Sequence, residues 1–281
     1  MLPTVGQLLA AARPRLAATP FGAPPREAIL LLGHVLGLSE AQILARPERE
    51  VAAEDAARFQ ALLDWRLTGE PVAYLTGVRE FYGRTFHVDD RVLIPRPETE
   101  HIVEAALGLD LPAAPRILDV GTGSGCLAVT LALEIPGSRV AAVDLSPGAL
   151  AVAAGNARRL GAAERISFLG LDLTGGLDLS RFDLVVSNPP YVDLEEAAQM
   201  SPEVCNFEPR LALFAPGAGD SILARLFGEC AALRSGVMLL VEIGYRQLDV
   251  SRQHAEASGL QLAEVWHDYS GFPRVLSLRR R

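Results

Sequence analysis

The residues best suited to chemistry form one tetrapeptide, Asn188-Pro189-Pro190-Tyr191, which directly follows the apolar run from 182 to 187. That run predicts a short buried strand. The two prolines have fixed φ angles and no N–H, so the chain leaves the strand stiff and extended. Asn188 Oδ1 and the Pro189 carbonyl can both accept hydrogen bonds there, and Tyr191 adds a flat ring. Open α/β sheets bind their ligands at such carboxyl ends of parallel strands.

The nucleophile that suits this tetrapeptide is a planar amine. The NH₂ group of an amide or of a nucleic-acid base is a poor nucleophile because its lone pair is delocalised. Asn188 Oδ1 and the Pro189 carbonyl can hold its two hydrogens, so that the lone pair points at an electrophile. Tyr191 can pack against the planar group. The tetrapeptide therefore predicts group transfer to a planar nitrogen and leaves open whether that nitrogen belongs to an amide or a base.

A glycine-rich turn provides a candidate cofactor site. The predicted strand 117–120 leads into Gly121-Thr122-Gly123-Ser124-Gly125, and a helix is expected from 126 to 135. Glycines let the backbone approach a ligand, and the helix N-terminus presents free N–H groups. A dinucleotide fingerprint requires its last glycine at position 126, which is Cys126 here. The turn therefore favours a single nucleoside carrying an amino-acid tail, S-adenosylmethionine, over NAD.

Acidic and apolar residues at the next two strand ends complete this cofactor site. The predicted strand 139–143 ends at Asp144, which is placed to accept hydrogen bonds from both hydroxyls of a ribose. Asp172 and Leu173 follow the predicted strand 165–169, where an adenine ring can lie. A strand, glycine turn, helix, strand and terminal aspartate together predict a nucleoside-binding Rossmann-like unit.

Three regions are predicted along the chain. Residues 1–75 have helical periodicity and are expected to form a small substrate-recognition bundle. Residues 76–96 are rich in β-formers and turn residues and predict a β-hairpin linker. Residues 97–281 alternate strands and helices, with seven strands in all, and predict an α/β Rossmann-like domain. Within it, the long connection 192–219 is expected to be a lid.

A proline-rich stretch, Ile94-Pro95-Arg96-Pro97-Glu98-Thr99-Glu100, precedes this domain. Its prolines favour an extended chain, and Pro97 can open a helix whose first turn is acidic. We expect Ile94 and Arg96 to line a pocket below the edge of the sheet.

Composition narrows the class of protein. The chain has 281 residues, a formal net charge of −8 and a pI of about 5.2, which weighs against a dedicated nucleic-acid binder. Cys126, Cys205 and Cys230 are widely spaced and form neither a disulfide framework nor a metal motif. No signal peptide or membrane-spanning run is visible. We therefore expect a cytoplasmic protein with no metal and no membrane partner.

The motifs together resemble a class I S-adenosylmethionine-dependent methyltransferase acting on planar nitrogen. More narrowly, the chain resembles the release factor glutamine methyltransferase family (HemK or PrmC type) over essentially its whole length. That narrower resemblance also rests on the stretches 94–100 and 207–213. It implies N5-methylation of the glutamine in the Gly-Gly-Gln motif of class 1 peptide chain release factors, which supports translation termination. The donor would be S-adenosylmethionine and the product S-adenosylhomocysteine.

The resemblance also implies roles for particular residues. Gly121 to Gly125, Asp144, Asp172, Leu173 and Asn188 would contact the cofactor. Asn188, Pro189 and Tyr191 would be catalytic, and the substrate would be held by Asn188, Pro189, Pro190, Tyr191, Ile94, Arg96 and Glu208. Relatives can carry an aromatic residue at the position of Leu173, so stacking on adenine becomes aliphatic packing here.

Two other functions fit parts of the pattern. Adenine-N6 and guanine-N2 methyltransferases of nucleic acids share the Asn-Pro-Pro-Tyr tetrapeptide, but they should carry a basic surface and a target-recognition region, so no direct contact with nucleic acid is expected here. A protein that binds the cofactor without transferring its methyl group is the second alternative.

Overall fold

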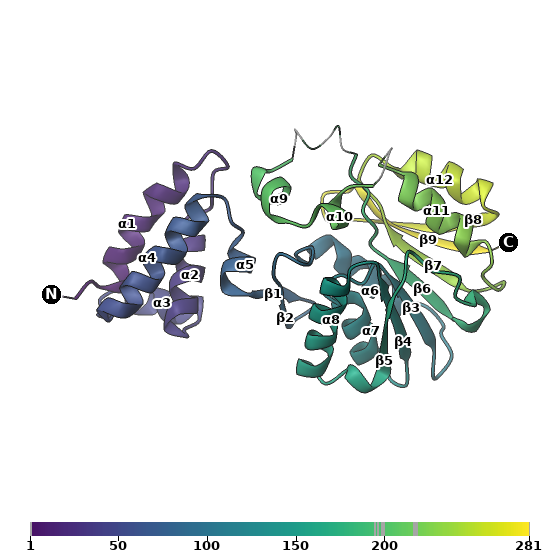
Figure 1. Ribbon diagram of the computed structural model, residues 1–281, viewed down its shortest axis with the longest axis horizontal. Coiled ribbons are helices and arrows are strands. Elements are labelled where there is room, and N and C mark those ends of the chain that lie inside the picture. The colour runs from purple at the N-terminus through teal and green to yellow at the C-terminus, as the bar shows by residue number, and fades with distance from the viewer. Residues whose placement is uncertain (1, 194, 196, 198–199, 216–218, 281) are drawn as a thin grey trace. The chain divides into compact units, whose positions relative to one another are not determined.

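The computed structural model describes residues 2–193, 195, 197, 200–215 and 219–280, which form two compact units (Figure 1). The first unit comprises the described residues of Met1–Val78 and Gln199–Phe207, and the second those of Arg79–Ala198 and Glu208–Arg281. None of the described helices is long and apolar enough to cross a membrane.

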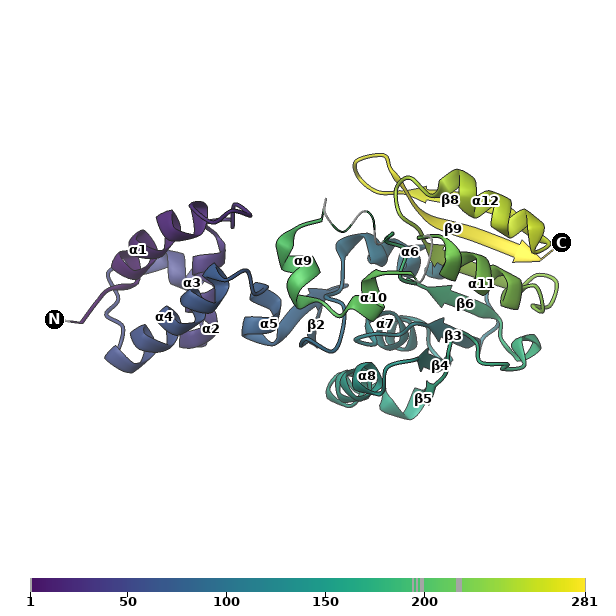
Figure 2. The ribbon, with the colours of Figure 1, turned by 45° about the horizontal axis from the view of Figure 1, so that its top comes forward.

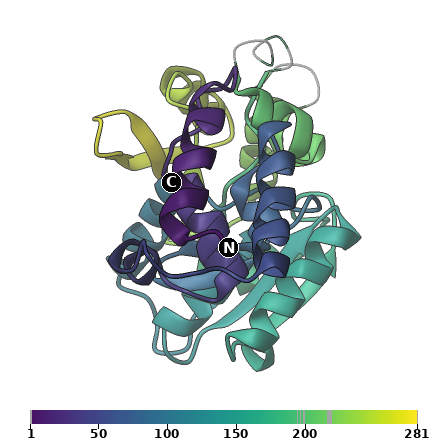
Figure 3. The same ribbon diagram turned by 90° about the vertical axis from the view of Figure 1, so that its left-hand side faces the viewer.

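The first unit is a helical bundle in which α1, α2 and α4 pack side by side (Figures 1 and 3). Thr4 and Ser39 open α1 and α3 with capping boxes, which satisfy N–H groups that lack partners within the helix. The helices of this unit are α1 (Val5–Ala17), α2 (Glu27–Leu36), α3 (Glu40–Ala45), α4 (Ala53–Leu67), α5 (Val72–Thr76) and α9 (Pro202–Phe207).

One buried arginine ties distant segments of this unit together. Arg66 is 1% exposed and donates to Glu27 at 2.7 Å, and it also pairs with Glu203 of α9. Its guanidinium lies 4.6 Å from the centre of the Phe21 ring. Burying a charge is tolerable only when it is paired and hydrogen-bonded, and both carboxylates meet that condition. α9 therefore belongs to the first unit although it is encoded far along the chain.

The second unit is built on a seven-stranded sheet with the order β5-β4-β3-β6-β7-β9-β8. All neighbouring strands from β5 to β7 are parallel, and β9 is antiparallel to β7 and β8. The strands are β3 (Arg116–Val120), β4 (Arg139–Asp144), β5 (Ile166–Gly170), β6 (Leu184–Ser187), β7 (Met238–Glu242), β8 (Leu260–His267) and β9 (Pro273–Arg280).

Helices cover both faces of this sheet (Figure 2). Successive strand residues point to opposite faces, so Ile117 packs with α6 and α7 whereas Leu118 packs with α11. Both faces are therefore apolar, as parallel sheets require. The helices are α6 (Glu100–Leu107), α7 (Cys126–Glu134), α8 (Pro147–Arg159), α10 (Arg210–Leu213), α11 (Ser221–Cys230) and α12 (Leu248–Ala257), with short 3₁₀ turns η1 (Pro97–Thr99), η2 (Ala163–Arg165) and η3 (Leu179–Arg181).

The predicted hairpin is present as β1 (Val78–Phe81) and β2 (Arg84–His87). Tyr82 and Gly83 join the strands with φ of 49° and 69°, the backbone of a two-residue hairpin turn. Phe81 and Phe86 meet edge to face at 6.0 Å and are buried in the core of the second unit. The hairpin is thus part of that core.

The fold predicted from the sequence is confirmed: a seven-stranded α/β sheet, an N-terminal helical region and a small hairpin. The expected lid, 192–219, folds in its described parts into α9, the isolated bridge from Val192 to Phe214, and α10. Residues 194, 196, 198–199 and 216–218 of that segment lie outside the described residues.

Candidate active site

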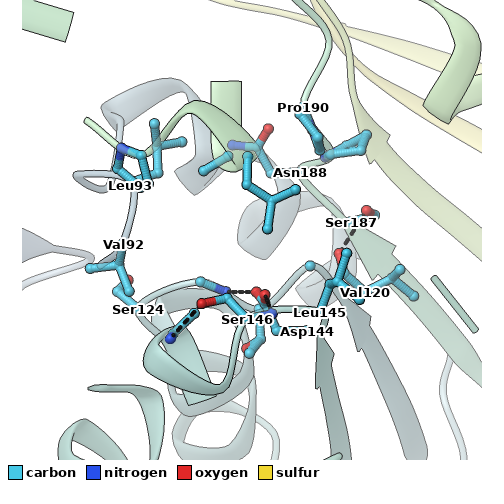
Figure 4. A pocket seen from close by; sticks show the side chains of 18 of the residues that line it. Val92, Leu93, Val120, Ser124, Asp144, Leu145, Ser146, Ser187, Asn188 and Pro190 are labelled. Carbon is cyan, nitrogen blue, oxygen red and sulfur yellow. Dashed lines mark hydrogen bonds between the residues drawn. The ribbon is translucent and has the colours of Figure 1, made fainter. Parts of the chain in front are cut away.

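A pocket in the second unit lies at the carboxyl ends of β3, β4, β5 and β6 (Figure 4). Asn188 and Asp144 lie on opposite sides of it, with Val92 and Leu93 along a third side. Most of the residues named from the sequence line it: Arg96, Gly121, Thr122, Gly123, Ser124, Asp144, Asp172, Leu173, Asn188, Pro189 and Pro190. Gly125, Ile94, Tyr191 and Glu208 do not line it, and their positions are described below.

The glycine turn and Asp144 form one hydrogen-bonded unit. Asp144 Oδ2 accepts the Gly123 N–H at 2.9 Å, and Oδ1 accepts the Ser146 N–H at 2.8 Å. Each carboxylate oxygen has a further lone pair, so Asp144 can still accept hydroxyl hydrogens from the pocket. Gly123 has a φ of 54°, and the space beside its Cα is open. The backbone therefore presents a bare edge to a ligand held by Asp144.

Gly125 supports the turn from behind. Its φ is 80°, and an added Cβ would lie 3.0 Å from the Cβ of Ala153 on α8. A side chain at this position would therefore both strain the backbone and push α8 away. Asn156 of α8 donates to the Ser124 carbonyl at 2.8 Å, which fixes the turn from the same side.

Asp119, at the end of β3, braces the start of α7 beneath the turn. Its Oδ2 accepts from Thr122 Oγ1 at 2.6 Å and from the Ala128 N–H at 3.1 Å. Burial raises the pKa of this carboxyl to about 7, against the lowering effect of the two hydrogen bonds. Its Oδ1 is buried without a partner among the described residues. Asp119 is thus a costly buried group that holds the glycine turn in shape.

Cys126 lines the pocket directly after the turn. Burial raises the pKa of its thiol to about 12. Only a thiolate is a strong sulfur nucleophile, so this cysteine stays neutral and does not compete for an electrophile in the pocket.

Asn188 is positioned by the strand that precedes it and by η1. Ser187 Oγ donates to the Val120 carbonyl at 2.8 Å, which locks the end of β6 to β3. Asn188 Nδ2 donates to Thr99 Oγ1 at 2.9 Å, and Thr99 Oγ1 donates to Glu242 Oε2 at 2.6 Å. Within the described part of the chain, Asn188 Oδ1 receives no hydrogen bond and remains available to a ligand.

Tyr191 turns from the pocket toward β7. Its hydroxyl donates to Glu242 Oε1 at 3.3 Å, and its carbonyl accepts from Gln247 Nε2 at 2.9 Å. Burial raises the pKa of the Tyr191 hydroxyl. Burial also raises the pKa of Glu242 to about 7, although the Thr99 hydroxyl bond and the charge of Arg274 oppose that rise. Tyr191 thus contributes an anchored hydroxyl behind the site.

At the pocket rim, Glu208 joins Ile94 and Arg96 through hydrogen bonds. Glu208 is 4% exposed, and its carboxylate accepts from the Ile94 N–H at 3.2 Å and from Arg96 Nη2 at 2.5 Å. Arg96 lines the pocket, whereas Ile94 is buried behind it. The two stretches 94–100 and 207–213 are therefore joined through one buried carboxylate.

Asp172 and Leu173 lie where the sequence placed them, at the pocket edge after β5. Leu173 has a φ of 51°, a left-handed backbone that is uncommon for a non-glycine residue. Asp172 is exposed and pairs with Arg225 at 2.8 Å. The strained turn therefore fixes where the aliphatic side chain of Leu173 stands.

The sequence patterns do not indicate two residues that hold the tetrapeptide: Thr99, which lines the pocket, and Glu242, which is buried outside the pocket lining. The pattern around Thr99 indicates only a proline-rich helix start. Glu242 does carry a signal in the sequence: it is a carboxylate at the end of an otherwise apolar strand, and unpaired charges are rarely buried.

Comparison with known proteins identifies the family of this chain. A model of the PrmC N-terminal domain matches residues 7–77, and a model of the methyltransferase small domain matches residues 104–204. The release factor glutamine methyltransferase of Chlorobaculum tepidum is 43% identical over 266 residues, covering 90% of each chain. That of Koribacter versatilis is 42% identical, covering 98% of this chain and 95% of its own. The chain belongs to the release factor glutamine methyltransferase family.

A solved structure outside this family has the same fold. The catalytic domain of hMettl16, in complex with MAT2A 3′UTR hairpin 6, aligns with a TM-score of 0.57 at 19% identity. The match covers 74% of this chain and 80% of that one. At such identity the likeness describes the fold alone.

As a release factor glutamine methyltransferase family member, the protein uses S-adenosylmethionine, and the pocket fits this cofactor. The open backbone edge at Gly123 and the carboxylate of Asp144 match an amino-acid tail and a ribose. Leu173 gives the pocket an apolar wall that could accommodate an adenine ring. When bound, the cofactor supplies an electrophilic methyl group.

Proposed function

We propose that this protein methylates the side-chain amide nitrogen of the glutamine in the Gly-Gly-Gln motif of class 1 peptide chain release factors. The observation that carries the proposal is the arrangement of Asn188. Its Nδ2 is held by Thr99, its Oδ1 accepts no hydrogen bond from the described residues, and Pro189 lines the pocket next to it. Two acceptors of this kind match the two hydrogens of a primary amide.

The work of the protein in this reaction is orientation. Asn188 Oδ1 and the Pro189 carbonyl hold the glutamine NH₂ so that its lone pair faces the pocket floor, where Gly123 and Asp144 hold the cofactor. The neutral Cys126 thiol leaves the glutamine nitrogen as the nucleophile. Both hydrogens of the amide meet neutral oxygens, so binding needs no charged base, and the proton that the nitrogen loses on methylation is released to water.

We further propose that the first unit recognises the release factor and that the reaction takes place in the cytoplasm. Support comes from the match of residues 7–77 to the PrmC N-terminal domain. The release factor glutamine methyltransferase named for Escherichia coli, 41% identical over 254 residues, points to the same substrate class.

A competition experiment tests this function. Purified protein is incubated with labelled S-adenosylmethionine and three substrates together: a class 1 release factor, DNA and ribosomal RNA. We expect label in the release factor alone, and a release factor whose Gly-Gly-Gln glutamine is changed to glutamate serves as the matched control. Label found only in nucleic acid would instead assign the site to a base amine.

A further inference from the structure

A buried hydrogen-bond chain runs behind the tetrapeptide, from Asn188 through Thr99 to Glu242. The first link, Asn188 Nδ2 to Thr99 Oγ1, is 2.9 Å, and the second, Thr99 Oγ1 to Glu242 Oε2, is 2.6 Å. Thr99 is 2% and Glu242 1% exposed. Water is therefore largely excluded from the chain, and each partner must be satisfied by the next.

The direction of this chain follows from counting hydrogens. An ionised Glu242 has no hydrogen and can only accept, so it takes the single hydroxyl hydrogen of Thr99. The Thr99 oxygen then has only lone pairs to offer Asn188, and it must face the NH₂ end of that amide. Flipping the amide would set Asn188 Oδ1 against a second acceptor with no hydrogen between them. The planar amide therefore turns Oδ1 toward the pocket.

We propose that Thr99 and Glu242 are positioning residues that set the amide of Asn188 with its oxygen toward the substrate NH₂. The inference rests on the proposed function, because only a substrate that donates two hydrogens needs an acceptor there. Glu242 does not line the pocket, and Thr99 lines it with its hydroxyl hydrogen bonded to Glu242. Their effect passes through the orientation of one side chain.

Protonation of Glu242 reverses this polarity. A neutral Glu242 can donate to Thr99, whose own hydrogen is then free to bond Asn188 Oδ1 and draw it away from the substrate. The groups that face Glu242 are Thr99 and Glu98 of η1, Tyr191 after β6, Arg274 of β9 and the Cys126 thiol of α7. Burial is the largest influence on its pKa, about 7, so methyl transfer should decline as the pH falls below about 7.

Kinetics of three variants test the chain. Thr99→Val removes the relay, and we expect kcat to fall about 10- to 100-fold while S-adenosylmethionine affinity stays within about twofold. Thr99→Ser keeps a hydroxyl and should restore most of the activity. Glu242→Gln can either donate or accept, so kcat should fall several-fold and the loss of activity below about pH 7 should disappear.

The matched control is Thr130→Val on α7. Thr130 is equally buried, and its hydroxyl has no partner among the described residues, so this substitution should leave kcat and its pH profile unchanged. Wild-type kcat in Thr99→Val, or an unchanged pH profile in Glu242→Gln, would overturn the inference.

A measurement without substrate separates this inference from the proposed function. The side-chain NH₂ signals of Asn188, followed by nitrogen-15 NMR in the free protein, should shift between pH 5 and pH 8 in the wild type. They should stay fixed in Glu242→Gln. Identical titration in both proteins contradicts the chain, whatever the substrate. Absence of methyl transfer to a release factor by the wild type contradicts the proposed function alone.

Discussion

Among single residues, Asp144 is the best placed to bind the cofactor ribose. Both of its oxygens are fixed by backbone N–H groups, and the residue lines the pocket. We expect Asp144→Ala to weaken S-adenosylmethionine binding about tenfold, through loss of ribose hydrogen bonds of roughly 1.5 kcal/mol. Isothermal titration calorimetry with the cofactor measures this directly.

The control for that variant is Asp183→Ala. Asp183 is also a carboxylate beside a strand, and it accepts the Arg116 N–H at 2.8 Å, but it does not line the pocket. Its loss should leave cofactor affinity unchanged. Equal affinities for wild type and Asp144→Ala would remove Asp144 from the cofactor site.

Glu242 also affects the stability of the folded protein, through its ionisation. Its pKa is raised from 4.5 in the unfolded chain to about 7 in the folded protein, so the folded state binds more protons between these values. Stability from this group is therefore full below pH 4.5 and is lost as the pH rises through about 7. We expect Glu242→Gln to raise the free energy of unfolding by roughly 2–3 kcal/mol at pH 8 relative to wild type.

Urea unfolding of both proteins at pH 5 and pH 8 measures this difference. The advantage of Glu242→Gln should be much smaller at pH 5, where the wild-type carboxyl is largely protonated. A variant that is less stable than wild type at pH 8 would show that the buried carboxylate is better compensated than its surroundings suggest. The ionised Glu242 carboxylate that orients the Asn188 amide thus lowers the stability of the folded protein.

At the scale of elements, the packing of α7 against α8 depends on Gly125. We expect Gly125→Ala to lower the free energy of unfolding by about 2–3 kcal/mol, because it combines a left-handed backbone with a clash against Ala153. Gly236→Ala is the matched control: its φ is 87°, but nothing lies within 4 Å of the added Cβ. It should cost about 1 kcal/mol, the backbone strain alone.

Thermal or urea unfolding of the two alanine variants separates the two contributions. A similar loss of stability in both would mean that α8 yields to the new methyl group without cost. Gly125→Ala should also bind S-adenosylmethionine more weakly, because the clash shifts the glycine turn and the N-terminus of α7.

The strands, the glycine turn and the tetrapeptide could be predicted because each is encoded in a short contiguous stretch. Asn188 follows a buried strand, and Asp144 ends another, so strand order alone brings them to one edge. The Thr99–Glu242 pair could not be predicted, since its partners are 143 residues apart and depend on the packing of η1 against β7.

At the scale of the whole molecule, the division of the chain into two units departs from its order in sequence. The connection after the tetrapeptide contributes α9 to the first unit, through the pairing of Glu203 with Arg66, 137 residues away. No local pattern in 192–219 indicates this pairing. Glu208, the next residue after α9, holds the pocket rim of the second unit. The stretch 207–213 thus spans the boundary between the units.

Methyl transfer to one glutamine nitrogen is the reaction that we propose for this site. Mass spectrometry of a class 1 release factor, before and after incubation with wild-type enzyme and S-adenosylmethionine, tests it most directly. We expect a mass increase of one methyl group, located on the Gly-Gly-Gln glutamine. With Asn188→Ala, the rate of methylation should fall about 100-fold. An unmodified glutamine would contradict the proposed function, and full activity in Asn188→Ala would contradict the role of that side chain.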